Sequence, residues 1–360
     1  MVPFRMLRKR NHAMKISEAK SLLIHVANHN YGRSYNDKDR LPAILMISKP
    51  GIGKTAIVRQ AAETIRASRD ETYGHFSKIL ADEDPGVVGG MFNIINGRTT
   101  RSLPEWFPTA PNGIQFWDEF TKAVPLLQNT VGSIFYDGTL NGVPFPSGWT
   151  AVAACNFRSD RAGDFEMPEH VRTRFSCVEI EPDAEETYSY FMSLKRPMAV
   201  CAYLRLHPDH VHTHDPSKPG QPFASPRTWE MLCNILTSAL PTNDQKALAR
   251  GVVGEAITTD FFAFMPQYEE LYAKYNPYTI VKSPSTAPIP RKNQPDLMQI
   301  LATTLGHYVK KVDKNAFPAV VEYMMRLPAE YTEGCMRDIV EKYPDLKETK
   351  AYVTWATSQK

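Results

Sequence analysis

The stretch Ile47–Val58, ISKPGIGKTAIV, links a short apolar run to a helical pattern through a glycine-containing turn. A phosphate-binding loop needs this context, because main-chain N–H groups of the turn point at phosphate oxygens and the helix dipole favours negative charge. Lys54 is expected to reach the β- and γ-phosphates, and the Thr55 hydroxyl is expected to hold Mg²⁺. The predicted nucleotide-binding residues are Pro50, Gly51, Ile52, Gly53, Lys54, Thr55 and Ala56.

One position departs from the G-x-x-x-x-G-K-[ST] pattern of phosphate-binding loops. Ser48 stands where that pattern has its first glycine. Serine is small and Gly51 remains in the turn, so we expect the loop to form. From the loop alone, a strand, turn and helix that bind no nucleotide stay the alternative.

Gly113–Phe120, GIQFWDEF, is a second landmark, in which an apolar run ends in two adjacent carboxylates. Open α/β sheets bind ligands at the C-terminal ends of their strands. We therefore expect Asp118 to hold Mg²⁺ and Glu119 to polarise an attacking water. A strand that simply runs out into solvent has the same pattern, but its pairing with the loop favours a nucleotide site.

The remaining apolar runs complete the expected nucleotide domain. A helix is predicted at Lys54–Ser68, and one strand is predicted within Gly113–Phe120. The other strands are predicted at Ala43–Ile47, His75–Leu80, Thr150–Cys155 and Phe175–Ile180. Between them, 81–111 is predicted to form an elaborated loop or hairpin, and Asp137–Gly148 a β-hairpin.

Polar residues at the ends of these elements are further candidates. Asn156, directly after a strand, is expected to orient the water or contact the γ-phosphate, with a turn-forming role as the alternative. Arg172 and Arg174 lie in a short helical stretch before the last strand. The alternative for these arginines is a solvated basic helix end, which the macrodipole favours.

The spacing from Asp183 to Tyr275 is helical, with Asp183 as a predicted N-cap. A polar, proline-rich break at 206–225 contains four histidines, namely His207, His210, His212 and His214. No cysteine or carboxylate cluster completes a zinc site there, so an exposed loop is favoured over a metal site. Ser225-Pro226-Arg227 opens the next helix and places Arg227 at its mouth.

Composition divides the chain into five parts. An N-terminal helix and linker (1–40) precede the α/β nucleotide-binding domain (41–182) and a helical lid (183–275). A connection at 276–296 contains five prolines and is predicted to be extended rather than part of a core. A helical C-terminal extension (297–360) follows.

The composition also limits the class of protein. The 360 residues are 42% hydrophobic and can bury a sizeable core, while the formal net charge of +3 is too small to indicate nucleic acid by itself. The five widely spaced cysteines form no C-x-x-C pair and predict reduced thiols in a cytoplasmic protein. The sequence contains no run of eighteen apolar residues, so no membrane-spanning helix is predicted.

The order of these landmarks resembles that of an AAA+ ATPase. The sequences around them resemble the bacterial and phage members of the MoxR-like branch. The resemblance covers about 43–264 and is carried by GIGKT, WDE, AVAACNF, MPEHVRTRF and Ser225-Pro226-Arg227. It implies a five-stranded parallel sheet between helices, an α-helical lid, ATP, Mg²⁺ and a ring that is usually a hexamer. Thr173, where the family usually has Asp, leaves open whether Arg172 shares the role of Arg174.

The resemblance also implies roles for single residues. Asn156 matches the first sensor residue, and Arg227 matches the second sensor at the lid. Arg174 matches the arginine that is inserted into a neighbouring subunit's site. The inserts of the family would be parts of Gly89–Pro104 and Asp137–Gly148.

For the whole protein, the resemblance favours a chaperone-like remodeller of a protein partner, often one with a von Willebrand factor A domain. A nucleic-acid motor or loader is the alternative, but the expected inserts mix basic, acidic and apolar residues and show no basic stripe with interleaved aromatic residues. A scaffold that binds ATP and barely hydrolyses it is a third hypothesis, against which Glu119 and Arg174 argue.

Overall fold

The computed structural model describes residues 13–157, 164–194, 196–291 and 293–358. By its internal packing the chain divides into two compact units, one of 1–187 with 211–231 and the other of 188–210 with 232–360. The predicted boundaries at 40, 182, 275 and 296 stay a prediction. None of the helices in the described ranges is long and apolar enough to cross a membrane.

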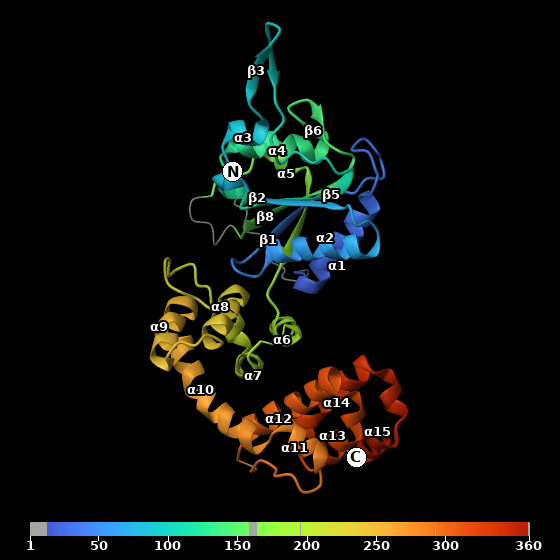
Figure 1. Ribbon diagram of the computed structural model, residues 1–360, viewed down its shortest axis with the longest axis vertical. Coiled ribbons are helices and arrows are strands. Elements are labelled where there is room, and N and C mark those ends of the chain that lie inside the picture. The colour runs from blue at the N-terminus through green and yellow to red at the C-terminus, as the bar shows by residue number, and fades with distance from the viewer. Residues whose placement is uncertain (1–12, 158–163, 195, 292, 359–360) are drawn as a thin grey trace, which may run out of the picture. The chain divides into compact units, whose positions relative to one another are not determined.

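The first unit is built on a five-stranded parallel sheet in the order β2-β5-β8-β1-β9 (Figure 1). Its strands are β1 (Ala43–Ser48), β2 (Gly74–Ile79), β5 (Asn112–Asp118), β8 (Gly148–Asn156) and β9 (Phe175–Ile180). The strands alternate between the two faces, so that Ile44 and Met46 of β1 join one buried cluster while Ala43 and Leu45 join the other. The predicted fold class, a five-stranded parallel sheet between helices with a helical C-terminal region, is confirmed.

Helices cover both faces of this sheet (Figure 1). On one face, α1 (Ile16–Asn30) packs beside α2 (Lys54–Ser68), and both contribute apolar side chains to a cluster with the sheet. On the other face lies α4 (Pro125–Tyr136), with α3 (Pro85–Gly89) and α5 (Glu169–Arg172) nearby. The described residues of this unit also contain two short 3₁₀ turns, η1 (Leu80–Asp82) and η2 (Phe120–Lys122).

Two small antiparallel ribbons extend from the same unit. One is formed by β3 (Phe92–Ile95) and β4 (Arg98–Arg101), and Figure 1 shows it as a projecting hairpin. The other is formed by β6 (Thr139–Leu140) and β7 (Val143–Pro144). Hairpins were predicted in both stretches and are confirmed, whereas the helix α3 was not predicted.

The described residues of 183–275 outside the predicted break at 206–225, and those of 297–358, are mostly helical, as predicted. Asp183 accepts a hydrogen bond from the Glu186 N–H at 2.9 Å as a cap for α6. The helices are α6 (Ala184–Ser193), α7 (Met198–Leu206), α8 (Pro226–Leu236), α9 (Thr242–Val253), α10 (Glu255–Lys274), α11 (Pro277–Lys282), α12 (Pro295–His307), α13 (Phe317–Met324), α14 (Ala329–Lys342) and α15 (Lys350–Ser358). Shorter turns are η4 (Pro208–Val211), η6 (Lys314–Ala316), η7 (Pro344–Glu348) and the π-helical η5 (Tyr308–Val312).

The proline-rich stretch 276–296 differs from its prediction. It was predicted as an extended connection outside any core, and this is wrong, because it forms α11 and buries Ile280 and Ala287 in the main apolar cluster of the second unit. Asn276 caps α11, and Pro277 occupies its first turn. Prolines lack N–H donors but keep their carbonyls, and the Tyr323 hydroxyl donates to the Pro288 carbonyl at 2.6 Å. Residues 283–290, which follow α11, therefore pack without helix or strand structure.

Candidate nucleotide-binding site

The predicted phosphate-binding loop lies at the C-terminal end of β1 and leads into α2. Gly51 has a φ of +79° and Gly53 a φ of +97°, in the left-handed region where glycine is at ease. Gly53 is also the N-cap of α2. Because successive residues alternate in handedness, the main-chain N–H groups of such a turn gather on one side and form a concave site for anions.

Lys54 is held in this site by two oxygen atoms. Its Nζ donates to the Ser48 hydroxyl at 2.9 Å and to the Asn156 side-chain carbonyl at 3.0 Å. Ser48 and Asn156 face each other in the register of β1 and β8, so both lie at the same sheet edge. Ser48 therefore fits the loop and also supplies a hydroxyl that glycine lacks.

The ionisation of Lys54 reflects this setting. Burial lowers the pKa of Lys54, the Asp118 carboxylate opposes that shift, and the Arg227 guanidinium adds to it. A bound phosphate chain would bring further negative charge and favour the ammonium form.

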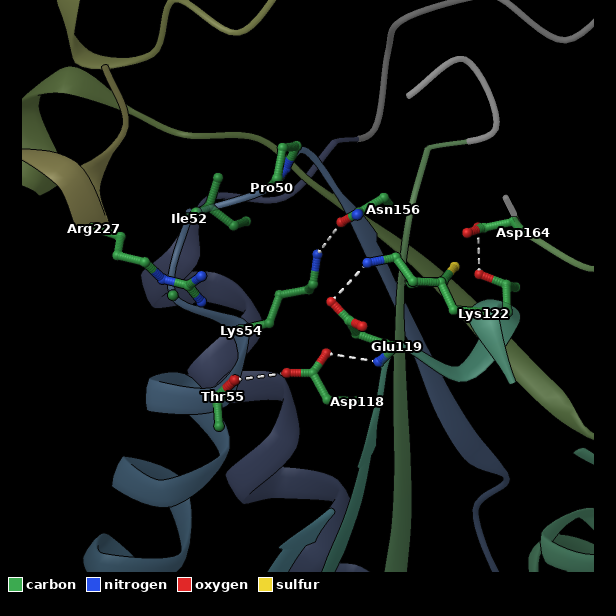
Figure 2. Close-up of a pocket in the computed structure, with 14 residues that line it drawn as sticks. Pro50, Ile52, Lys54, Thr55, Asp118, Glu119, Lys122, Asn156, Asp164 and Arg227 are labelled. Carbon is green, nitrogen blue, oxygen red and sulfur yellow. Dashed lines mark hydrogen bonds and ion pairs between the residues drawn. The ribbon is translucent and has the colours of Figure 1, made fainter. Parts of the chain in front are cut away.

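The two predicted carboxylates follow β5. Asp118 accepts a hydrogen bond from the Thr55 hydroxyl at 2.8 Å and another from the Glu119 N–H at 2.9 Å (Figure 2). Glu119 has a φ of +51°, which is costly for a residue with a Cβ and recurs at functional sites. Its carboxylate is paired with the Lys122 ammonium at 2.8 Å.

One pocket gathers most of the predicted residues (Figure 2). The predicted residues that line it are Pro50, Gly51, Ile52, Gly53, Lys54, Thr55, Asp118, Glu119, Asn156 and Arg227. Arg227 comes from the first turn of α8, and its main-chain N–H donates to the Gly51 carbonyl at 3.1 Å. Figure 2 shows its side chain beside the loop, near Ile52.

Two predicted residues do not line this pocket. Ala56 belongs to the first turn of α2, behind the loop. Arg174 lies between α5 and β9, and its guanidinium donates to the Gly132 carbonyl of α4 at 2.6 Å and approaches the Asp137 carboxylate at 3.9 Å. Arg174 is therefore placed away from the nucleotide pocket of its own chain.

Sequence reasoning missed four residues of the pocket, namely Thr121, Lys122, Cys155 and Asp164. The Thr121 hydroxyl donates to the Asp164 carboxylate at 2.7 Å, and the Phe165 N–H donates to the Thr121 carbonyl at 2.8 Å. The spacing of Lys122 from Glu119 on a 3₁₀ turn was a local signal that could have been read. Asp164 lies more than forty residues from its partner in sequence, and no local pattern marks it.

The zinc alternative finds no support in the described part of the chain, where no group of three or more His, Cys, Asp or Glu side chains is arranged to hold a metal ion. His210 instead shares a hydrogen bond with the Tyr203 hydroxyl at 2.8 Å, and His212 contacts the Pro50 carbonyl. The five cysteines are thiols, four of them buried.

No protein-family profile and no curated protein sequence matches this chain. Among solved structures, NtrX from Brucella abortus matches with 13% identity and a TM-score of 0.41, over 92% of this chain and 69% of its own. The replication initiator DnaA, bound to AMPPCP and single-stranded DNA, matches with 11% identity and a TM-score of 0.37, over 97% of this chain and 96% of its own. Hsp104 with ATPγS and FITC-casein matches with 13% identity and a TM-score of 0.34, over 65% of this chain and 47% of its own. Likeness of this degree carries no conclusion about what the chain binds.

Proposed function

We propose that this chain is an AAA+ ATPase that hydrolyses ATP to ADP and phosphate. The observation that carries the proposal is that side chains of complementary chemistry converge on one pocket, namely Lys54, Thr55, Asp118, Glu119, Asn156 and Arg227. They come from the first turn of α2, from the ends of β5 and β8 and from the start of α8. Phosphoryl transfer depends on positioning and charge stabilisation, which such a set can supply.

The pocket also fits Mg²⁺. This ion prefers oxygen ligands and is usually held by one or two protein groups together with substrate phosphates and waters. The Thr55 hydroxyl and the Asp118 carboxylate lie 2.8 Å apart beside the loop, and both would hold the ion. When bound, it neutralises charge on the β- and γ-phosphates.

The protein groups then divide the work. Lys54 exchanges its contacts with Ser48 and Asn156 for the phosphate oxygens, which are stronger acceptors for an ammonium. Glu119 polarises the attacking water and accepts its proton, and Asn156 orients that water or the γ-phosphate. Arg227 acts on nucleotide bound in its own chain, since its main chain is attached to the loop at Gly51.

A direct test of ATPase activity is phosphate release by the purified protein with Mg²⁺ and ATP. Lys54→Ala should abolish nucleotide binding, because it removes the ammonium group at the end of the phosphate-binding loop that would contact the phosphate oxygens. Lys49→Ala is the matched control, since Lys49 is five residues earlier and does not line the pocket. Wild-type protein that binds no ATP, or Lys54→Ala protein that binds it normally, would contradict the proposal.

We further propose that the ATPase is a MoxR-like remodeller that assembles into a ring, of six subunits by the resemblance. It acts on a protein partner such as one with a von Willebrand factor A domain. The β3–β4 hairpin supports a protein partner, because Phe92 is 68% exposed and Ile94 is 81% exposed. Neighbouring exposed apolar side chains that form a contiguous patch are one mark of a protein-binding surface. The five thiols support a cytoplasmic location.

The alternative, a nucleic-acid motor or loader, makes a different prediction about salt and stimulation. Binding through phosphates releases counterions and weakens steeply with salt. We expect the ATPase rate to be unchanged by single-stranded DNA or RNA at physiological salt and to respond to the protein partner. The measurement is phosphate release with and without each nucleic acid across a salt series. Strong stimulation by single-stranded DNA would favour the motor instead.

Lys122→Met is expected to raise turnover at saturating ATP by about two- to fivefold, because Glu119 must leave the Lys122 ammonium before it can polarise water. The gain is modest because both side chains are partly exposed, and such pairs contribute about 0.2–1 kcal/mol. Lys78→Met, which breaks the 2.7 Å pair with Glu83 outside the pocket, is the control. Steady-state phosphate release checks both variants. A fall in turnover for Lys122→Met would mean that Lys122 contacts the phosphates.

A further inference from the structure

The segment 211–231, which contains His212 and the start of α8, reaches the phosphate-binding loop through one ring and one main-chain N–H group. The His212 Nε2 atom lies 2.8 Å from the Pro50 carbonyl oxygen. A carbonyl can only accept, so Nε2 carries the proton and donates it. The Arg227 N–H donates to the next carbonyl, that of Gly51, at 3.1 Å. Two successive carbonyls of the loop are thus bonded by the same segment, 211–231.

These two bonds fix more than the carbonyls. In a planar trans peptide, the C=O of one residue and the N–H of the next point in opposite directions. A Pro50 carbonyl held by His212 therefore turns the Gly51 N–H away from His212, and a Gly51 carbonyl held by Arg227 does the same for the Ile52 N–H. Gly51 and Ile52 both line the nucleotide pocket.

The segment is itself anchored well enough to act in this way. The Thr213 N–H donates to the Ala224 carbonyl at 2.9 Å, and the Ala224 N–H donates to the Thr213 hydroxyl at 2.9 Å. These bonds close the loop directly beside His212. The Phe223 ring lies 5.9 Å from the His212 ring and 4.7 Å from the His214 ring, measured between centroids.

The contact with the loop is also close. A Cβ placed on Gly51 would lie 2.6 Å from the Ser225 hydroxyl oxygen and 2.9 Å from its Cβ. Gly51 therefore lets the two main chains approach, in addition to allowing its positive φ. The loop has little freedom to rotate its peptide planes while 211–231 is in place.

We propose that His212 is a positioning residue that orients the phosphate cradle, by holding the Pro50 carbonyl so that the Gly51 N–H faces the triphosphate. The inference rests on the proposed function only in so far as the cradle takes a triphosphate. His212 touches neither phosphate nor water in this scheme. Its loss should weaken binding and leave the chemical step unchanged.

The experiment measures binding of inorganic tripolyphosphate with Mg²⁺ by calorimetry, so that neither adenine recognition nor hydrolysis enters. His212→Phe keeps a ring against Phe223 but removes the donor, and it should weaken binding about three- to tenfold, the range of one lost hydrogen bond. His212→Gln restores an N–H at similar reach and should bind within about twofold of wild type. His214→Phe is the matched control, because His214 packs on the same Phe223 ring.

A split between binding and turnover distinguishes positioning from a merely structural role. In ATP hydrolysis, His212→Phe should raise KM by the same factor as the tripolyphosphate Kd and leave kcat within about twofold. Equal binding by wild type and His212→Phe would overturn the inference, as would equal losses for His212→Phe and His214→Phe or failure of His212→Gln to recover. Wild-type protein that binds tripolyphosphate but does not hydrolyse ATP would refute the proposed function and leave the inference about His212 standing.

Discussion

Glu119→Gln is expected to bind ATP about as tightly as the wild-type protein and to lose about 10²- to 10⁴-fold in turnover, the usual contribution of a positioned general base. Glutamine has nearly the same size and can occupy the same pocket. Its amide, however, cannot accept a proton from a water molecule. The Thr55–Asp118 hydrogen bond, which marks the proposed Mg²⁺ position, does not involve the Glu119 side chain and should survive.

The measurement pairs equilibrium ATP binding with phosphate release in a single turnover, so that product release cannot hide the chemical step. Glu83→Gln is the matched control, because Glu83 is also paired with a lysine but does not line the pocket. Wild-type turnover in Glu119→Gln would remove Glu119 from catalysis. Loss of binding instead of turnover would mean that Glu119 maintains the pocket, consistent with its left-handed backbone, rather than activating water.

Much of the nucleotide domain could be predicted because its signals are local. The helix Lys54–Ser68 begins at the lysine of the loop, as predicted, and each strand agrees to within a residue or two. A glycine turn, an apolar run before it and a helical period after it all lie within one short stretch. The carboxyl ends of parallel strands share an edge, so the meeting of Asp118 and Asn156 with the loop also followed from the pattern.

What could not be predicted depends on contacts between distant parts of the chain. His212 and Pro50 are 162 positions apart, and no period or motif connects them. The proline-rich stretch has a composition typical of linkers, yet its carbonyls accept bonds from α13 and the following turn, from Tyr323 and Arg326. A residue that acts as an acceptor through its main chain leaves no mark on the side-chain pattern.

Two roles are open to Arg174, one structural within its own chain and one catalytic in a neighbouring subunit. Its contacts with the Gly132 carbonyl and the Asp137 carboxylate lie at the C-terminal end of α4, where a cation is favoured by the helix dipole. Arg174 would then be a structural link only. Alternatively, as the resemblance implies, it is donated to the site of the next subunit, where an arginine typically contributes about 10³- to 10⁵-fold in rate.

Mixing two inactive variants separates these roles. Arg174→Ala and Lys54→Ala proteins should each be nearly inactive, the first for lack of a donated cation and the second for lack of bound ATP. In a ring assembled from equal amounts of both, about a quarter of the interfaces pair an intact loop with an intact Arg174, if the subunits mix at random and meet head to tail. We expect phosphate release to recover to a comparable fraction of the wild-type rate.

The mixture of Arg227→Ala with Lys54→Ala is the necessary contrast. Arg227 is bonded to the loop of its own chain, so each of these variants spoils its own site and no interface is complete. Activity should stay at the residual level.

Repeating the first mixture with Arg172→Ala in place of Arg174→Ala asks whether the neighbouring arginine shares the role, because a shared role predicts a low rate alone and recovery on mixing. If Arg174 only links α4 to β9, Arg174→Ala will melt at a lower temperature and no mixture will restore its rate. Recovery with Arg227→Ala and none with Arg174→Ala would exchange the two roles, with Arg227 acting on the neighbour and Arg174 within its own chain.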